Sequence, residues 1–284
     1  MEQSLYYKSS NKLTILGFLG LFLGSALVGV VLSIPYLWGI QKIPYTKINF
    51  LLAIILGAIL GWVCNFLCGA LKIRNRSLAV TAVILGIFVY TYFKWSTYVS
   101  FIYTDSYTDL LLSLILNPAA LLSGILEINE VGTWSLSDSN AVTGVFLAIV
   151  WLGEFLIISG IQICIMFDRP TEPFIESENR WAMKKESAVY LRYFAVKDMK
   201  SAIEQDPSVI LSYVDDPAVV APISHVRIDH FHSSDYSENY ITVKEVQVKN
   251  AKNAKVEEKK VIKKLAVSRA YISDLYSKAG ISFA

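Results

Sequence analysis

The 284-residue chain lacks the short motifs that mark common enzymes. It has no glycine-rich phosphate loop, no G-x-S-x-G nucleophile elbow and no H-E-x-x-H zinc helix. Its three cysteines, Cys64, Cys68 and Cys164, all lie in apolar segments, so a disulfide framework is excluded. The three histidines all lie outside those segments, which argues against a metal site within them. The sequence therefore predicts no cofactor, and it favours a protein that is not an enzyme.

Charge is scarce in the first 167 residues and abundant afterwards. Only seven of the 24 acidic and eight of the 26 basic residues precede Asp168. The charge-poor part contains four apolar segments, at 13–34, 49–71, 78–98 and 142–166. Each approaches or exceeds the ~20 residues with which a helix crosses a hydrocarbon core of roughly 30 Å. We expect a four-span α-helical membrane domain at 1–167 and a small α+β domain with an antiparallel sheet at 168–284.

Basic residues in short loops predict orientation, because they stay on the cytoplasmic side. They cluster before the first span, between the second and third, and after the fourth: Lys8, Lys12, Lys72, Arg74, Arg76, Arg169, Arg180, Lys184 and Lys185. The stretch 98–140 has five acids and no base, so it is expected outside. Loop 35–48 departs from this charge pattern, since it must be external yet carries Lys42 and Lys47.

Both chain termini are then expected in the cytoplasm. The first span is interpreted as an uncleaved anchor, because its apolar core is longer than that of a cleavable signal peptide. The general plan resembles that of many bacterial inner-membrane proteins, and we expect that location.

Segment 109–126 is apolar enough to be mistaken for a fifth span. Its polar and small residues recur every three or four positions, in a narrow stripe: Asp109, Ser113, Asn117, Ala120, Gly124 and Glu127. Pro118 would bend a helix midway. We expect a kinked helix in the outer interface, or a shallow re-entrant pair that meets at Asn117 and Pro118. A crossing here would place the C-terminal domain outside.

Small residues predict how the spans pack. One stripe on the first span consists of Gly17, Gly20 and Gly24, and a second stripe on the next span consists of Gly57, Gly61, Asn65 and Cys68. Small residues at this spacing let helix backbones approach each other closely. We expect these two stripes to meet.

Glu154 lies near the midpoint of the fourth span, where a charge costs on the order of 3 kcal/mol or more. It must be neutral, paired or facing water. One interpretation is a carboxyl that handles protons or cations, and the other is an acid hydrogen-bonded to Tyr90, Tyr92 or Gln162. Lys94 is expected to reach the outer surface, because a pair with Glu154 requires a difference in depth to be bridged. Asn65 and Gln162 complete the intramembrane polar candidates.

The C-terminal part alternates between helical and strand patterns. Residues 180–205 have helical spacing with a break near Val196, while 225–232 and 240–249 alternate as strands. A change of parity predicts a β-bulge near Lys244 and Glu245. A third strand at 256–265 and a helix capped by Ser268 are preferred over one helix at 253–279.

Two groups in this part could bind ligands. His230 and His232 point the same way from a predicted strand, but an exposed polar face is favoured over a metal site. A lysine-rich run could contact anionic lipid headgroups, although a solvated surface is the default; its members include Lys255, Lys259, Lys260, Lys263 and Lys264. Nucleic acid is not expected, because no aromatic residue interleaves these lysines.

Three functions remain open from the sequence. We favour an integral membrane scaffold or accessory subunit whose cytoplasmic domain docks a protein partner or another copy of itself. The first alternative is a channel or transporter component that uses Glu154. The weaker alternative is a membrane-embedded enzyme that acts on lipid beside an aromatic cluster, with Lys94, Asp105 and Asp109 as its candidate groups. An aromatic belt at the membrane interface explains this cluster more simply.

Overall fold

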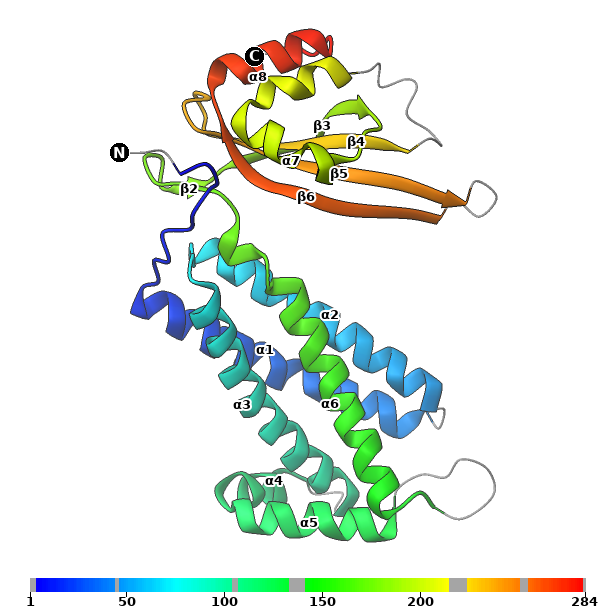
Figure 1. The fold of residues 1–284 in the computed structure, drawn as a ribbon. Coiled ribbons are helices and arrows are strands. Elements are labelled where there is room, and N and C mark those ends of the chain that lie inside the picture. Colours follow the sequence, from blue (N-terminus) through cyan, green and yellow to red (C-terminus); the bar gives the residue numbers. More distant parts are fainter. Residues whose placement is uncertain are drawn as a thin grey trace. The chain divides into compact units, whose positions relative to one another are not determined.

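The computed structural model describes residues 4–43, 46–103, 107–132, 141–214, 224–250 and 255–282. The chain forms two compact units, which are shown in Figure 1. One is helical and covers Ser10–Thr171, and the other combines Met1–Ser9 with Glu172–Ala284. Asp105 and the side chain of Lys255 lie outside the described residues.

Among the described residues, four helices are long and apolar enough to cross a membrane, and each contains most of one predicted span. They are α1 (Ile15–Lys42), α2 (Thr46–Ala70), α3 (Arg76–Tyr103) and α6 (Gly144–Met166). Large apolar side chains project outward from them, including Leu16 at 80% exposure and Trp62 at 67%. Exposure of such an apolar surface is favourable toward lipid chains and unfavourable toward water. These features support an integral membrane protein.

The ambiguous segment forms a bent pair, α4 (Tyr107–Leu116) and α5 (Pro118–Val131), with an angle of 115° between the helices. Asn117 ends the first helix and caps the second, because its side-chain oxygen accepts a hydrogen bond from the Ala120 amide at 3.1 Å. Pro118 occupies the first turn of α5, where its missing N–H costs nothing. The bend predicted at these two residues is confirmed.

The glycine stripes contact different neighbours from those we expected. A Cβ atom on Gly20 or Gly24 would meet Leu71 or Leu67, so the stripe on α1 packs against leucines near the end of α2. A Cβ on Gly57 would lie 2.9 Å from the Ile158 carbonyl oxygen. The stripe on α2 therefore packs on α6, and the predicted meeting of the two stripes is wrong. Spacing identifies a small face but not the helix that it contacts.

The second unit contains a four-stranded antiparallel sheet in the order β3–β4–β5–β6. The strands are β3 (Met183–Arg192), β4 (His225–His232), β5 (Asn239–Asn250) and β6 (Lys255–Val267). A short hairpin, β1 (Phe174–Ile175) and β2 (Arg180–Trp181), precedes them. The described part of the unit also has three helical segments: α7 (Val196–Gln205), the 3₁₀ segment η2 (Pro207–Tyr213) and α8 (Arg269–Lys278). Another 3₁₀ turn, η1 (Arg169–Thr171), follows α6 in the helical unit.

The predicted helix over 180–205 is correct only for its second half. Residues 183–192 form β3, which pairs with β4, and its buried Val189 and Leu191 alternate toward the core. Pairing with a neighbouring strand outweighs a weak helical spacing here. Of the later predictions, a strand rather than a helix before α8 is confirmed. The bulge predicted in β5 near Lys244 is wrong: the ladder shifts between Val243 and Lys244 because β6 contributes the extra residue, whereas β5 pairs with β4 without a shift.

One core lies between the sheet and the helical segments on one of its faces (Figure 1). It includes Ile228, Val243 and Ile262 from successive strands, together with Ile203 of α7 and Ile272 of α8. These five side chains are fully buried, which commits this face of the sheet to the fold of the unit.

The N-terminal segment adds to the sheet, which the sequence did not lead us to expect. Tyr6 pairs with Leu265 in an antiparallel bridge. The Tyr7 amide donates to the Lys264 carbonyl, and the Ala266 amide donates to the Leu5 carbonyl, both at 2.9 Å. The first nine residues therefore belong with the C-terminal unit and not with the spans that follow them.

Candidate functional site

Lys94 of α3 and Glu154 of α6 form an ion pair inside the helical unit. Lys94 Nζ lies 2.6 Å from Glu154 Oε1, and the two side chains are 10% and 19% exposed. The expectation that Lys94 reaches the outer surface is therefore wrong. Each charge has the other as its partner, which offsets part of the cost of placing either alone in hydrocarbon.

The directions of α3 and α6 explain how Lys94 and Glu154 meet although they lie at different depths along the bundle. Arg76 at the start of α3 contacts Asp168 just beyond the end of α6, at 3.3 Å, so the two helices are antiparallel and share one end. From that end, at 1.5 Å per residue, Lys94 lies about 27 Å along α3 and Glu154 about 21 Å along α6. Side chains lean toward the N-terminus of their own helix, so these two lean toward each other.

Aromatic rings surround this pair. The Lys94 ammonium lies 5.7 Å from the centre of the Tyr36 ring of α1 and 5.9 Å from that of Trp95. Trp95 and Trp151 meet edge to face with 4.8 Å between their centres. Part of the aromatic cluster near Lys94 thus packs inside the bundle and shields an ion pair, in addition to any role at the interface.

The side chains expected to bind Glu154 lie elsewhere. The Tyr90 hydroxyl donates to Gln162 Oε1 at 3.2 Å, and Gln162 Nε2 donates to Cys64 Sγ at 3.3 Å. The Tyr92 hydroxyl contacts the Leu114 carbonyl at the end of α4. Gln162 therefore joins α2, α3 and α6 in a second polar group. Asn65 lies half-buried on α2.

In the α+β unit, His230 and His232 are buried, so the expected exposed polar face is wrong. His230 Nε2 lies 3.1 Å from Asn239 Oδ1, and Nδ1 lies 2.7 Å from the Tyr276 hydroxyl. The amide oxygen accepts from Nε2–H, which leaves Nδ1 to accept from the hydroxyl of the neutral ring. Burial lowers the pKa of His230 to about 4. The His232 ring stacks on Tyr236, with 4.2 Å between centres.

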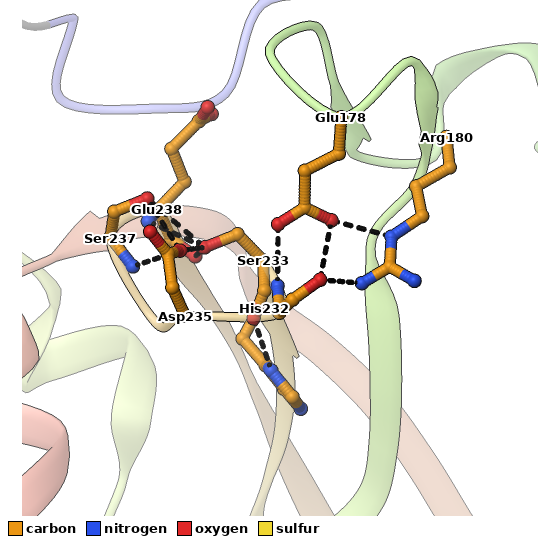
Figure 2. Close-up of polar contacts among 8 residues, drawn as sticks. Glu178, Arg180, His232, Ser233, Asp235, Ser237 and Glu238 are labelled. Carbon is orange, nitrogen blue, oxygen red and sulfur yellow. Dashed lines mark hydrogen bonds and ion pairs between the residues drawn. The ribbon is translucent and has the colours of Figure 1, made fainter.

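The acidic residues that follow these histidines fix a turn (Figure 2). Asp235 Oδ1 accepts hydrogen bonds from the Ser237 amide at 3.0 Å and from the Ser233 hydroxyl at 2.7 Å. These bonds hold the pKa of Asp235 well below its usual range. The described residues contain no group of three or more histidine, cysteine or acidic side chains placed to hold a metal ion.

The same turn is clamped to the β1–β2 hairpin (Figure 2). Glu178 accepts bonds from the Ser234 amide at 2.7 Å and hydroxyl at 2.9 Å, and it pairs with Arg180. Desolvation raises the pKa of Glu178, but the bonds from Ser234 and Arg180 outweigh it and hold the pKa below its ordinary value. The clamp explains the acidic and serine-rich sequence of this turn without a ligand.

Lysines on β6 lie near acidic residues of the same sheet. Lys259 and Lys260 are exposed and stand opposite Glu245 and Lys244 of β5. Lys244 itself is buried and contacts Asp229 at 2.6 Å and Glu258 at 3.1 Å. Lys263 is exposed and Lys264 half-buried. Alternation in the sequence showed that Lys244 lies in a strand, but only strand pairing reveals its acidic neighbours.

The chain matches no family model, no curated protein and no solved structure. Two structural features bear on its function: an aromatic-lined ion pair between α3 and α6, and an α+β unit that incorporates residues from before α1 and after α6.

Proposed function

We propose that this protein is an integral membrane scaffold or accessory subunit whose α+β unit docks a protein partner or a second copy of itself. The observation that carries the proposal is that this unit is built from two chain segments, one before α1 and one after α6. The unit is joined to the membrane helices twice, at Ser9–Ser10 and at Thr171–Glu172. Two connections restrict a domain more than one flexible linker does, which suits a docking module held at a membrane surface.

The pairing of Tyr6 with Leu265 supports an even number of crossings. Residues before α1 and after α6 can share one sheet only if both lie on the same side of the bilayer. Four crossings satisfy this condition, whereas α4 and α5 counted as one further span would break it. We therefore infer that the bent pair does not cross.

Charge supports a cytoplasmic position for the α+β unit. Lys72, Arg74 and Arg76 lie in or next to the connection between α2 and α3, at the end of the bundle that Arg169 shares. Basic residues in short connections are retained in the cytoplasm. A bacterial inner membrane with both termini inside accommodates this arrangement.

The Lys94–Glu154 pair also favours an anchor over a transport pathway. A carboxyl that takes up ions or protons must be released from its partner and reached by water, and this one contacts Lys94 among aromatic rings. Replacing Glu154 with Gln tests the alternative. Unchanged ion or proton flux in liposomes agrees with an anchor, whereas flux abolished in an intact protein would support a channel or transporter.

Site-specific photocrosslinking in native membranes tests the docking proposal. A crosslinker replaces exposed Lys197 or Lys259 of the α+β unit, and the matched control replaces exposed Leu16 of α1. We expect discrete protein adducts from at least one of the first two positions, with a defined stoichiometry in mild detergent. A single 31.8 kDa chain without a stoichiometric partner, and without adducts from either position, would contradict the proposal.

A further inference from the structure

The strand β6 forms one edge of the four-stranded sheet (Figure 1). Within the described residues, its outer side is paired where residues 5–7 meet 264–266, toward the end of the strand. The part before this contact is regular, because 256–260 pair with 248–244 of β5 without a shift. A regular strand edge presents backbone groups that another strand can pair with. Val256 on this stretch is 56% exposed.

The charges along this stretch are self-complementary. Its sequence, Val256-Glu-Glu-Lys-Lys-Val261, places two acids before two bases. When a second copy runs antiparallel, the acids of one strand approach the bases of the other. Opposite charges on neighbouring strands stabilise a sheet, whereas like charges directly opposite destabilise it.

Two-fold symmetry limits the register. An axis perpendicular to a continuous sheet leaves every side chain on its original face, so each residue stands opposite one of the same parity. With the axis at Glu258, Glu257 of each copy lies opposite Lys259 of the other. Val256 then lies opposite Lys260, whose methylene groups can cover it.

The neighbours of Glu258 make this register tolerable. Glu258 would stand opposite its own copy, a repulsive arrangement for two bare carboxylates. Each Glu258 is already paired with Lys244 at 3.1 Å and with Arg227. The alternative axis at Lys259 would bring together two exposed ammonium groups.

We propose that the β6 edges of two copies of this chain pair antiparallel about Glu258 and join two sheets into one. This inference rests on the proposed function and identifies the docked partner as a second copy. The bond-forming groups are the backbone of 256–260, and the order of two acids followed by two bases selects the partner and the register. The segment at residues 5–7 limits the paired stretch by occupying the rest of the edge.

Charge reversal in the full-length protein in nanodiscs tests the pairing. Lys259→Glu places two acids opposite each other twice, so we expect self-association to weaken by about tenfold or more. Adding Glu257→Lys in the same chain restores complementarity and should restore the dimer. Lys197→Glu is the matched control, because it makes the same charge change on an exposed position in the first turn of α7, where an acid is tolerated.

A crosslink checks the register without depending on charge. Val256→Cys with Lys260→Cys, on a background in which exposed Cys164 is Ser, should give a disulfide-linked dimer on oxidation. The two new thiols are about 13 Å apart along one strand, at about 3.3 Å per residue, so they cannot close within one chain.

The outcomes separate this inference from the proposed function. An oligomer that neither weakens with Lys259→Glu nor forms the crosslink overturns the β6 pairing and leaves docking through another surface. A wild-type chain that is monomeric and has no partner overturns both.

Discussion

Lys94 and Glu154 approach each other from antiparallel helices, and their side chains meet at 2.6 Å among aromatic rings. Neutralising one partner leaves the other charge buried without compensation. We expect Lys94→Met or Glu154→Gln alone to destabilise the helical unit by about 3–5 kcal/mol, as for other broken buried pairs. The double variant should be more stable than either single one, because no charge remains to be buried.

Unfolding in mixed micelles measures these differences. Glu130→Gln, on an exposed position of α5, is the control for losing an acid and should leave stability unchanged. A loss in the double variant equal to the sum of the two single losses would mean that the two charges are not coupled.

The contact between α2 and α6 depends on Gly57. An added methyl group there would lie 2.9 Å from a backbone oxygen of Ile158, which cannot move aside cheaply. Gly57→Ala should therefore destabilise the protein by about 1–3 kcal/mol, as overpacking does. Gly153→Ala on α6 is the control, because nothing lies within 4 Å of its added atom, and alanine favours the helix. Thermal unfolding of both variants in one detergent should show opposite signs.

Sidedness follows from the strand contributed by the N-terminal segment. Single cysteines at Ser9 and Ser277 should react with a membrane-impermeant maleimide from the same side of the bilayer, because both positions belong to the α+β unit. A cysteine at Glu130 should react from the opposite side. We expect the first two to be protected in intact bacterial spheroplasts and exposed in inverted vesicles. Labelling of Ser9 and Ser277 from opposite sides would refute four crossings.

The buried His230 predicts acid sensitivity of the α+β unit. Its pKa falls from 6.5 to about 4 on folding, so between these values the unfolded chain binds more protons than the folded one. Stability is therefore retained above pH 6.5 and lost as the pH falls toward 4, by at most about 3 kcal/mol. Burial also lowers the pKa of His232, which acts in the same direction.

Hydrogen exchange at pH 7.5 and at pH 5 measures this loss in the core strands. His230→Gln should flatten the pH dependence, although it lowers stability at neutral pH by disturbing the bonds to Asn239 and Tyr276. His225→Gln, at a half-buried position, is the control and should retain the wild-type slope. An unchanged slope in His230→Gln would exclude His230 as the group responsible.

The local features of the chain could be predicted because they depend on neighbours in sequence. Apolar length defined the four long helices, and Pro118 and Asn117 defined the bend. The cost of placing backbone groups in hydrocarbon and the restricted geometry of proline depend on short stretches of chain. Their effects can therefore be predicted from a single sequence.

Partners distant in sequence were decided by the tertiary structure. Lys94 paired with Glu154, Gly57 packed on α6, Tyr6 joined Leu265, and His230 became buried beneath Tyr276. Each contact depends on which faces of two elements meet, and several arrangements satisfy the same periodicity. The amino-acid pattern by itself determined where the chain enters hydrocarbon and where it turns. Packing of whole elements determined which charges neutralise each other, because burial and pairing energies exist only once those elements are in contact.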